Sequence, residues 1–331
     1  MINIIILNWI VMLMDTKIDF AVGGQAVIEG VMMRSPNNLV VAVRNPQNEI
    51  VYKKKPFRTL TQRYKWLNIP ILRGMINLIE MMVVGTDAIN YSASISMDEE
   101  EETKNKNEHK KNVKLKENGE KKMGILEIIM FSVSLVLALA FSLFLFKFLP
   151  LSITTLLEKV SPLVKNNFIV FNLIDGALKM SIFLLYIFIL SKVPSFNRIF
   201  QYHGAEHKSI FTYENSLELN PENAEKQSRF HPRCGTSFIL IVFVISIIVY
   251  TFVPKQETFL QNFIVRIGFL PIIAGISYEY LKLSAKYSKN SLVKLFIKPG
   301  LLFQHLTTQE PNKEQLEVGL SSLREALKME K

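Results

Sequence analysis

Cysteine is nearly absent from this sequence, since Cys234 is the only one in 331 residues. One cysteine cannot form an internal disulfide framework, which excludes the small disulfide-rich secreted domains and favours a reducing compartment. Glycine (14 residues) and proline (13 residues) are too few for a fibrous protein, and we find no repeat with a period of roughly 20–50 residues. With 49% apolar residues, the chain is too hydrophobic for intrinsic disorder.

A recognisable signal peptide is also missing. Residues 1–14 are apolar, but they have neither a basic segment before them nor a small-residue cleavage site after them. The stretch is too short to cross a bilayer. Two interpretations remain open, an over-extended start with Met14 as the first translated residue, or a segment lying at the membrane surface.

Long apolar runs, in contrast, are abundant. A helix needs roughly 20 apolar residues to cross a bilayer, and runs near this length occupy residues 125–149, 168–191, 238–253 and 263–281. A buried helix of a soluble protein would explain one run but not four. We therefore predict a mainly α, polytopic membrane protein with about four transmembrane helices.

The distribution of positive charge predicts the orientation. The net charge is +10, and Lys and Arg concentrate before residue 125, in the loop 192–237 and after residue 281. By the positive-inside rule these regions face the cytoplasm, which makes both termini cytoplasmic and the lipid bilayer the main partner. The basic residues are dispersed and no reading module is recognisable, so we expect no nucleic-acid binding.

Composition divides the rest of the chain into further segments. Residues 15–68 contain two β-favouring runs, Leu39–Arg44 and Glu49–Lys54, separated by a turn signal. They predict a small β-containing cytoplasmic module. The other predicted segments are an amphipathic interfacial helix over 69–97, a charged flexible linker over 98–122, a transmembrane bundle over 123–300 and a C-terminal cytoplasmic amphipathic segment over 301–331.

The central loop carries the main candidate for chemistry, an H-x-x-E-H pattern made by His203, Glu206 and His207. On a helix, the two histidines lie one turn apart on the same face and can share a metal ion. Glu206 is then placed to act as the catalytic general base, the logic of the inverted zinc-peptidase motif.

Three further residues are candidate metal ligands because the predicted topology brings them toward the same membrane surface. His231 and Cys234 directly precede the third apolar run, and Glu279 lies at the cytoplasmic end of the fourth. The alternative is that these side chains form a structural cluster, or hydrogen-bond to the backbone, without catalysing a reaction.

Two charges interrupt the second apolar run, Asp175 and Lys179, at a spacing of i, i+4. Charges at this depth usually have a partner. We favour a mutual pair that stabilises the packing of the bundle, and the alternative is a polar transport pathway that also uses Arg266.

Four motifs, taken in order, resemble those of the YqhQ-like family of bacterial multi-pass membrane proteins. They are Gly23–Arg34, Tyr202–Lys208, Phe230–Ser237 and Leu306–Pro311. The resemblance covers nearly the whole chain from about Phe20, apart from the charged linker. It implies a bacterial cell membrane protein of a class labelled predicted metal-dependent enzymes, with no settled substrate.

The resemblance carries over to individual positions. In the N-terminal module it singles out Gln25, Glu29 and Arg34, which we predict to lie over the site and bind substrate. The sequence departs from the family pattern at His305 and Gln309, where basic residues are expected, and this argues against anion binding there. The remaining matching positions are His203, Glu206, His207, His231 and Cys234.

From these observations we predict a membrane-embedded, metal-dependent hydrolase with its site at the cytoplasmic surface. Its cofactor would be a divalent metal, with zinc favoured by the ligand types, and its substrate a peptide or a lipid-derived molecule. The alternative is a non-enzymatic scaffold or regulator with a structural zinc cluster. A homo-oligomer, and an unidentified protein or small-molecule partner, remain open.

Overall fold

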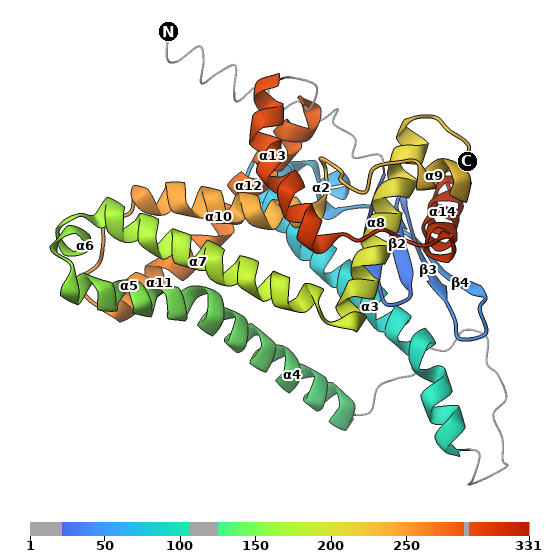
Figure 1. Cartoon of the computed structure of the whole chain (residues 1–331), viewed down its shortest axis with the longest axis horizontal. Coiled ribbons are helices and arrows are strands. Elements are labelled where there is room, and N and C mark those ends of the chain that lie inside the picture. Colours follow the sequence, from blue (N-terminus) through green and yellow to red (C-terminus); the bar gives the residue numbers. More distant parts are fainter. Residues whose placement is uncertain (1–21, 106–124, 288–290, 331) are drawn as a thin grey trace.

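The computed structural model describes residues 22–105, 125–287 and 291–330. The described chain is elongated, with a helical bundle at one end and a small sheet covered by helices at the other (Figure 1). The predicted mainly α architecture with an N-terminal sheet is confirmed. The predicted segment 1–14 and most of the predicted linker 98–122 lie outside the described residues.

The sheet is an antiparallel meander in the order β1-β2-β3-β4. The predicted β-favouring runs form β3 (Asn38–Arg44) and β4 (Ile50–Pro56). A second hairpin, β1 (Gly23–Val27) and β2 (Gly30–Arg34), precedes them in the glycine-containing motif. Among the described glycines none has positive φ. Gly24 and Gly30 instead allow close approach, since a Cβ on Gly30 would lie 2.3 Å from the carbonyl oxygen of Ala42.

Both faces of the sheet are covered. One face packs against α8 (Pro194–Glu214) and α14 (Lys313–Lys328), and the other packs against α3 (Leu72–Asn105). Burial on both sides explains why β2 and β3 are apolar at almost every position, with each large apolar side chain contributing about 1.5–3 kcal/mol. The first face presents Val31, Met33, Val40 and Ala42, and the second presents Met32, Leu39, Val41 and Val43.

The C-terminal amphipathic pattern corresponds to α14. Its Asn312 N-cap and Gln315 form a capping box. Its Leu323 is buried in the core formed by α8 and the sheet, and Leu316 and Leu320 are buried against Ala205 of α8. The C-terminal segment therefore holds α8 against the strands.

Among the described residues, the bundle contains three helical segments long and apolar enough to cross a membrane: Val133–Val160, Phe168–Ser191 and Phe259–Ser284. The third predicted run forms α10 (Gly235–Thr251), an apolar helix of 17 residues. At 1.5 Å per residue its length is about 25 Å, less than the roughly 30 Å hydrocarbon core. Of four predicted spans, three therefore meet the length requirement.

The elements of this region are α4 (Ile125–Leu143), η2 (Phe144–Phe148), α5 (Leu149–Val160), α6 (Pro162–Asn166), α7 (Phe168–Ser191), α10, α11 (Phe259–Gly268), α12 (Leu270–Lys286) and α13 (Ser291–Thr307).

A buried ion cluster joins two of the apolar segments. Asp175 accepts hydrogen bonds from Lys179 and from Arg266, and Arg266 also donates to the side chain of Asn172. The predicted Asp175–Lys179 pair is thus present, and Arg266 is a third member. These contacts link α7 to α11.

Candidate functional site

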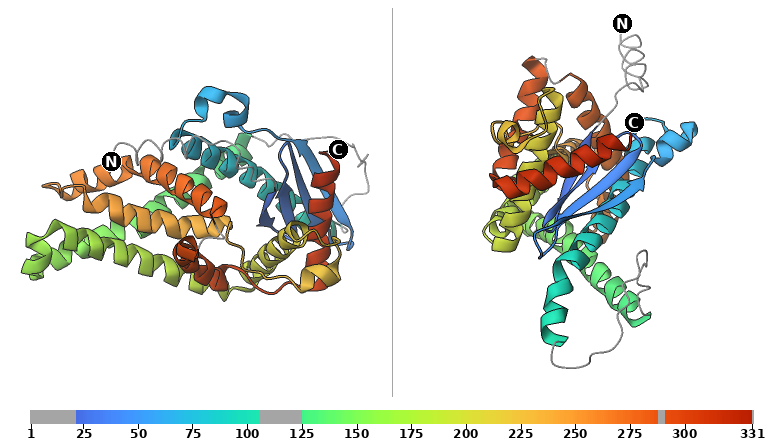
Figure 2. Two further views of the ribbon diagram at one scale, coloured as in Figure 1. Left: turned by 90° about the horizontal axis from the view of Figure 1, so that it is seen from above. Right: turned by 90° about the vertical axis from the view of Figure 1, so that its right-hand side faces the viewer.

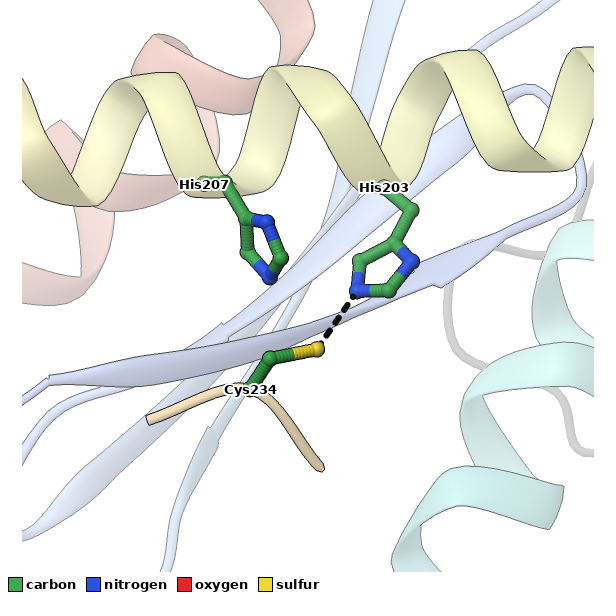
Figure 3. A group of neighbouring side chains, drawn as sticks. All are labelled: His203, His207 and Cys234. Carbon is green, nitrogen blue, oxygen red and sulfur yellow. Dashed lines mark hydrogen bonds between the residues drawn. The ribbon is translucent and has the colours of Figure 1, made fainter. Parts of the chain in front are cut away.

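Helix α8 presents both histidines of the H-x-x-E-H pattern to the same side. His203 and His207 lie one turn apart, and their rings point toward Cys234, which comes from the segment before α10 (Figure 3). Cys234 is the N-cap of α10, and its sulfur accepts a hydrogen bond from the backbone N–H of Thr236 at 3.4 Å. Two elements far apart in the chain therefore contribute to one cluster.

The three side chains form a group that could hold a metal ion. One ligand atom from each of His203, His207 and Cys234 lies within 4.8 Å of the others, and all three side chains are buried. The Nε2 atom of His203 is 3.2 Å from the Cys234 sulfur. The Nε2 atom of His207 is buried and has no hydrogen-bond partner among the described residues. An unpartnered ring nitrogen facing a thiol is what a metal site requires before the metal binds.

The remaining nitrogen of each ring is held by a backbone carbonyl. His203 Nδ1 lies 2.8 Å from the carbonyl oxygen of Thr307, and His207 Nδ1 lies 2.5 Å from that of Arg229. Since a carbonyl only accepts, Nδ1 must carry the proton, and in a neutral ring Nε2 then keeps its lone pair. Metal-binding histidines are commonly oriented in this way.

Electrostatics favour the thiolate at this position. Burial by itself would raise the pKa of Cys234, but the attraction of His203 and His207, together with the hydrogen bond to His203, holds it well below its usual range. Burial likewise opposes protonation of His203, but the Cys234 thiolate, with help from Glu206, raises the pKa of His203 to about 9. The cysteine is therefore already in the form that binds metals.

Glu206 lies beside this group without belonging to it. Its Oε2 atom is 3.6 Å from His207 Nε2 and 3.8 Å from His203 Nε2. Gly24 of β1 packs against it, since a Cβ on Gly24 would lie 2.7 Å from Glu206 Cγ. The carboxylate is buried on the side of the two ring nitrogens.

His231 is a neighbour of the cluster rather than a member of the group of three. Its ring centre is 5.6 Å from that of His207, and its Nε2 atom lies 3.4 Å from a carboxylate oxygen of Glu214. Burial, together with the nearby His207, lowers the pKa of His231 to about 4, which keeps this ring neutral. Its backbone N–H and C=O are both hydrogen-bonded to the buried side chain of Gln304.

Glu279 does not join the cluster, because its carboxylate is bound elsewhere. Arg73 of α3 donates to it through Nε at 2.6 Å and through Nη2 at 2.5 Å, and both side chains are buried. The predicted convergence of Glu279 on the histidines is absent among the described ligand groups. Its role in the structure is to connect α3 to α12.

Two of the three residues of the N-terminal motif face α3 rather than the cluster, and the third, Glu29, contacts α8. Gln25 faces α3, where its Oε1 atom would lie 2.6 Å from a Cβ on Gly85. Glu29 accepts hydrogen bonds from Arg198 and Tyr202. Arg34 shares the sheet face of Met32, also toward α3, and its guanidinium lies 5.1 Å from the centre of the Phe57 ring. It is the opposite face that lies against α8.

Sequence reasoning missed the groups that orient the cluster. The segment 307–312 crosses α8 at Gly204, where an added Cβ would lie 2.1 Å from the carbonyl oxygen of Gln309. This close approach brings the Thr307 carbonyl to His203. The only sequence signal for it was the motif at 306–311, together with a glycine inside a helix.

Two comparisons with known proteins show the family of this chain. The model of a family described as proteins of unknown function (DUF1385) matches residues 69–329. The chain is 36% identical over 314 residues to the uncharacterized protein YqhQ of Bacillus subtilis (strain 168), which covers 95% of this chain and 94% of that relative. No solved structure matches. By both measures the chain belongs to the YqhQ-like, DUF1385 family.

Proposed function

We propose that this protein is a membrane-embedded, metal-dependent hydrolase with its site at the cytoplasmic surface. One observation supports it above all others: both histidines are fixed through Nδ1, so their Nε2 atoms converge on the Cys234 sulfur. A hydrogen bond to a carbonyl orients a ring for metal binding, and a buried Nε2 atom with no other partner is free to coordinate.

The donor set fits a divalent transition metal, with zinc as the best match. Two imidazoles and one thiolate are borderline-soft ligands that suit zinc, whereas magnesium and calcium require oxygen. Catalytic zinc sites have three protein ligands and keep a fourth position open, whereas structural sites are closed by four. The chemistry that such a metal supplies is Lewis-acid activation of water and of the bond to be cleaved.

Glu206 takes the role of general base. Its carboxylate lies outside the group of three but next to both Nε2 atoms, where it would be close to an attacking water molecule. It would accept the proton of that water during attack and deliver it to the leaving group afterwards. His231 stays neutral and packs beside His207, which makes it a supporting residue.

A Glu206→Gln substitution tests this assignment. We expect zinc-loaded protein in vesicles to hydrolyse at least one member of a panel of blocked peptides and lipid-derived esters. Glu206→Gln should retain zinc and lose turnover by about 10²–10⁴-fold, the usual contribution of a general base. Glu222→Gln, the same change on α9 (Pro221–Glu225), is the control and should resemble the wild type.

The alternative of a structural zinc cluster in a scaffold protein predicts a different result. In a closed site Glu206 would be the fourth ligand, and Glu206→Gln would lose zinc and stability together. Retained zinc with unchanged turnover would also contradict the proposal.

A further inference from the structure

Residues 57–71, between the sheet and α3, expose large apolar and aromatic side chains. This segment contains α2 (Leu60–Arg63) and the 3₁₀ turn η1 (Lys65–Leu67). Trp66 is 69% exposed and Ile69 57% exposed. A cluster of exposed large apolar side chains marks a surface that contacts another phase or another molecule. Leu60, Tyr64 and Ile71 are also exposed.

The polar side chains of the same segment carry charge of one sign. Residues 57–71 contain Arg58, Arg63 and Lys65 but no Asp or Glu. All three cations are exposed, and none forms an ion pair with a described residue. The surface therefore combines aromatic side chains with three cations that have no ion-pair partner among the described residues, which complements an acidic surface.

The place of this segment in the fold identifies that surface. Its last residue, Ile71, packs directly on α12, since a Cβ on Gly275 would lie 2.5 Å from Ile71 Cγ2 and 2.7 Å from its carbonyl oxygen. Gly275 lies within the candidate span Phe259–Ser284. Both views of Figure 2 show the segment before α3 projecting sideways from the rest of the molecule, and the left view places it where the bundle meets the sheet along the long axis.

The backbone at Ile71 makes this sideways projection possible. Ile71 has φ of 71°, a left-handed conformation that β-branched residues rarely adopt. The chain turns sharply there, so α3 runs on along α12 and the sheet while residues 57–70 extend outward. Close packing against Gly275 keeps this strained turn in place.

We propose that residues 57–71 form an in-plane membrane anchor that inserts Trp66 into the headgroup region and binds acidic phospholipid through Arg58, Arg63 and Lys65. Tryptophan and tyrosine prefer the membrane–water interface because one end of the ring system is apolar and the other is polar. Basic residues near the surface are attracted to anionic lipids. The anchor fixes how far the sheet and α8 stand from the bilayer.

Trp66 is its own reporter, because the chain has two tryptophans and the other is Trp9. The experiment uses full-length protein carrying Trp9→Phe, reconstituted in phosphatidylcholine vesicles with and without phosphatidylglycerol. The quenchers are phosphatidylcholine brominated near the headgroup and aqueous iodide. We expect brominated lipid to remove at least half of the emission, and iodide to have little effect.

The control moves the reporter to the sheet. Tyr52 on β4 is an exposed aromatic residue whose hydroxyl is hydrogen-bonded to Ser321 of α14. A variant with Trp9→Phe, Trp66→Phe and Tyr52→Trp should be quenched by iodide and not by brominated lipid. Trp66 behaving like this control would overturn the proposal.

Two further outcomes are decisive. Protection of Trp66 from both quenchers would show that protein, such as a second copy, covers this surface, and would contradict the anchor. If the basic residues bind acidic phospholipid, brominated lipid should quench Trp66 more strongly when phosphatidylglycerol is present. The variant Arg63→Gln/Lys65→Gln should lose this difference between the two vesicle types. Equal quenching in both vesicle types would overturn that part.

Discussion

The chemistry of the candidate site depends on single atoms in two imidazole rings. Each ring of His203 and His207 has its Nδ1 atom bound to a carbonyl oxygen and its Nε2 atom directed at the thiol. The two carbonyls would not touch a bound metal, but they prepare the rings to bind one. They fix the tautomer of each ring and the direction of the Nε2 lone pair. Cys234 is stabilised as thiolate by the same rings and by its place at the start of α10.

The proton on His203 makes metal affinity depend on pH. In the metal-free protein the pKa of His203 is raised to about 9 by the Cys234 thiolate. A metal must displace that proton, so binding releases it and is favoured as pH rises. We expect the apparent association constant for zinc to rise by up to about tenfold per pH unit between about pH 6.5 and 8.5, and to level off above about pH 9.

Competition with a chromogenic chelator across this pH range measures the effect. Cys234 adds no further proton release there, because its pKa already lies well below its usual value. His203→Ala should bind zinc weakly and show a flatter profile. A wild-type affinity that does not change with pH would contradict the thiolate–imidazolium pair.

At the scale of elements, the site is an assembly of α8, the segment before α10 and the connection from α13 to α14. The connection lies on α8 at Gly204, and the backbone N–H of Gln309 donates to the carbonyl oxygen of Phe200 at 2.9 Å. Gln304 of α13 holds the backbone of His231 from both sides. His203 and His207 are therefore each oriented by a carbonyl group from outside α8.

Gly204→Ala tests the role of this close approach. The new methyl group would overlap the Gln309 carbonyl at 2.1 Å, so the connection must move away and take the Thr307 carbonyl with it. Without that acceptor His203 loses its orientation, and we expect zinc affinity to fall by about 10–100-fold. Chelator competition measures the loss.

Gly268→Ala is the matched control, because a Cβ at this position meets nothing within 4 Å. It should leave zinc affinity unchanged. If Gly204→Ala binds zinc as tightly as Gly268→Ala does, the connection does not orient His203.

The sequence predicted the part of the site that depends on the spacing of side chains along a helix. It did not predict the contacts that backbone carbonyl groups make with those side chains. The spacing of His203 and His207 was enough to place both on one face. The carbonyl acceptors at Thr307 and Arg229 could not be predicted, because every residue has a carbonyl group. Gly204 does not by itself reveal its contact in the sequence, and the structure shows it as the point where the 307–312 segment meets α8.

The N-terminal motif illustrates a second limit. Its resemblance to the family suggested that Gln25 and Arg34 lie over the site, but both side chains are on the α3 face of the sheet. The face of a strand is decided by register and by the partner helix. Glu279 was placed near the site by topology alone, which could not reveal Arg73 as its partner.

At the scale of the whole molecule, the two ends of the chain are adapted to different surroundings. The end with the sheet has apolar cores covered by amphipathic helices, and the bundle presents apolar side chains outward. Within the bundle, Asp175 is the shared partner of Lys179 and Arg266. One buried carboxylate is thus the partner of two buried basic side chains, which makes it hard to replace.

Asp175→Asn should therefore be strongly destabilising. Removing one partner of a buried ion pair costs about 3–5 kcal/mol, since the remaining charges stay buried without compensation. Thermal unfolding in detergent, followed by circular dichroism, measures the change. Glu158→Gln removes the partner of Lys255 from a more exposed pair and should cost about 1 kcal/mol or less. Equal effects of the two substitutions would contradict this account of the cluster.

The central claim is that His203, His207 and Cys234 bind a metal, and its most direct test is the metal content of the purified protein. The protein is purified in detergent without an affinity histidine tag, and metal per chain is measured by elemental mass spectrometry beside His203→Ala/His207→Ala. We predict close to one zinc, or another transition metal, per chain in the wild type and none in the double variant. A wild type that contains no metal, even after reloading with zinc, would contradict the claim.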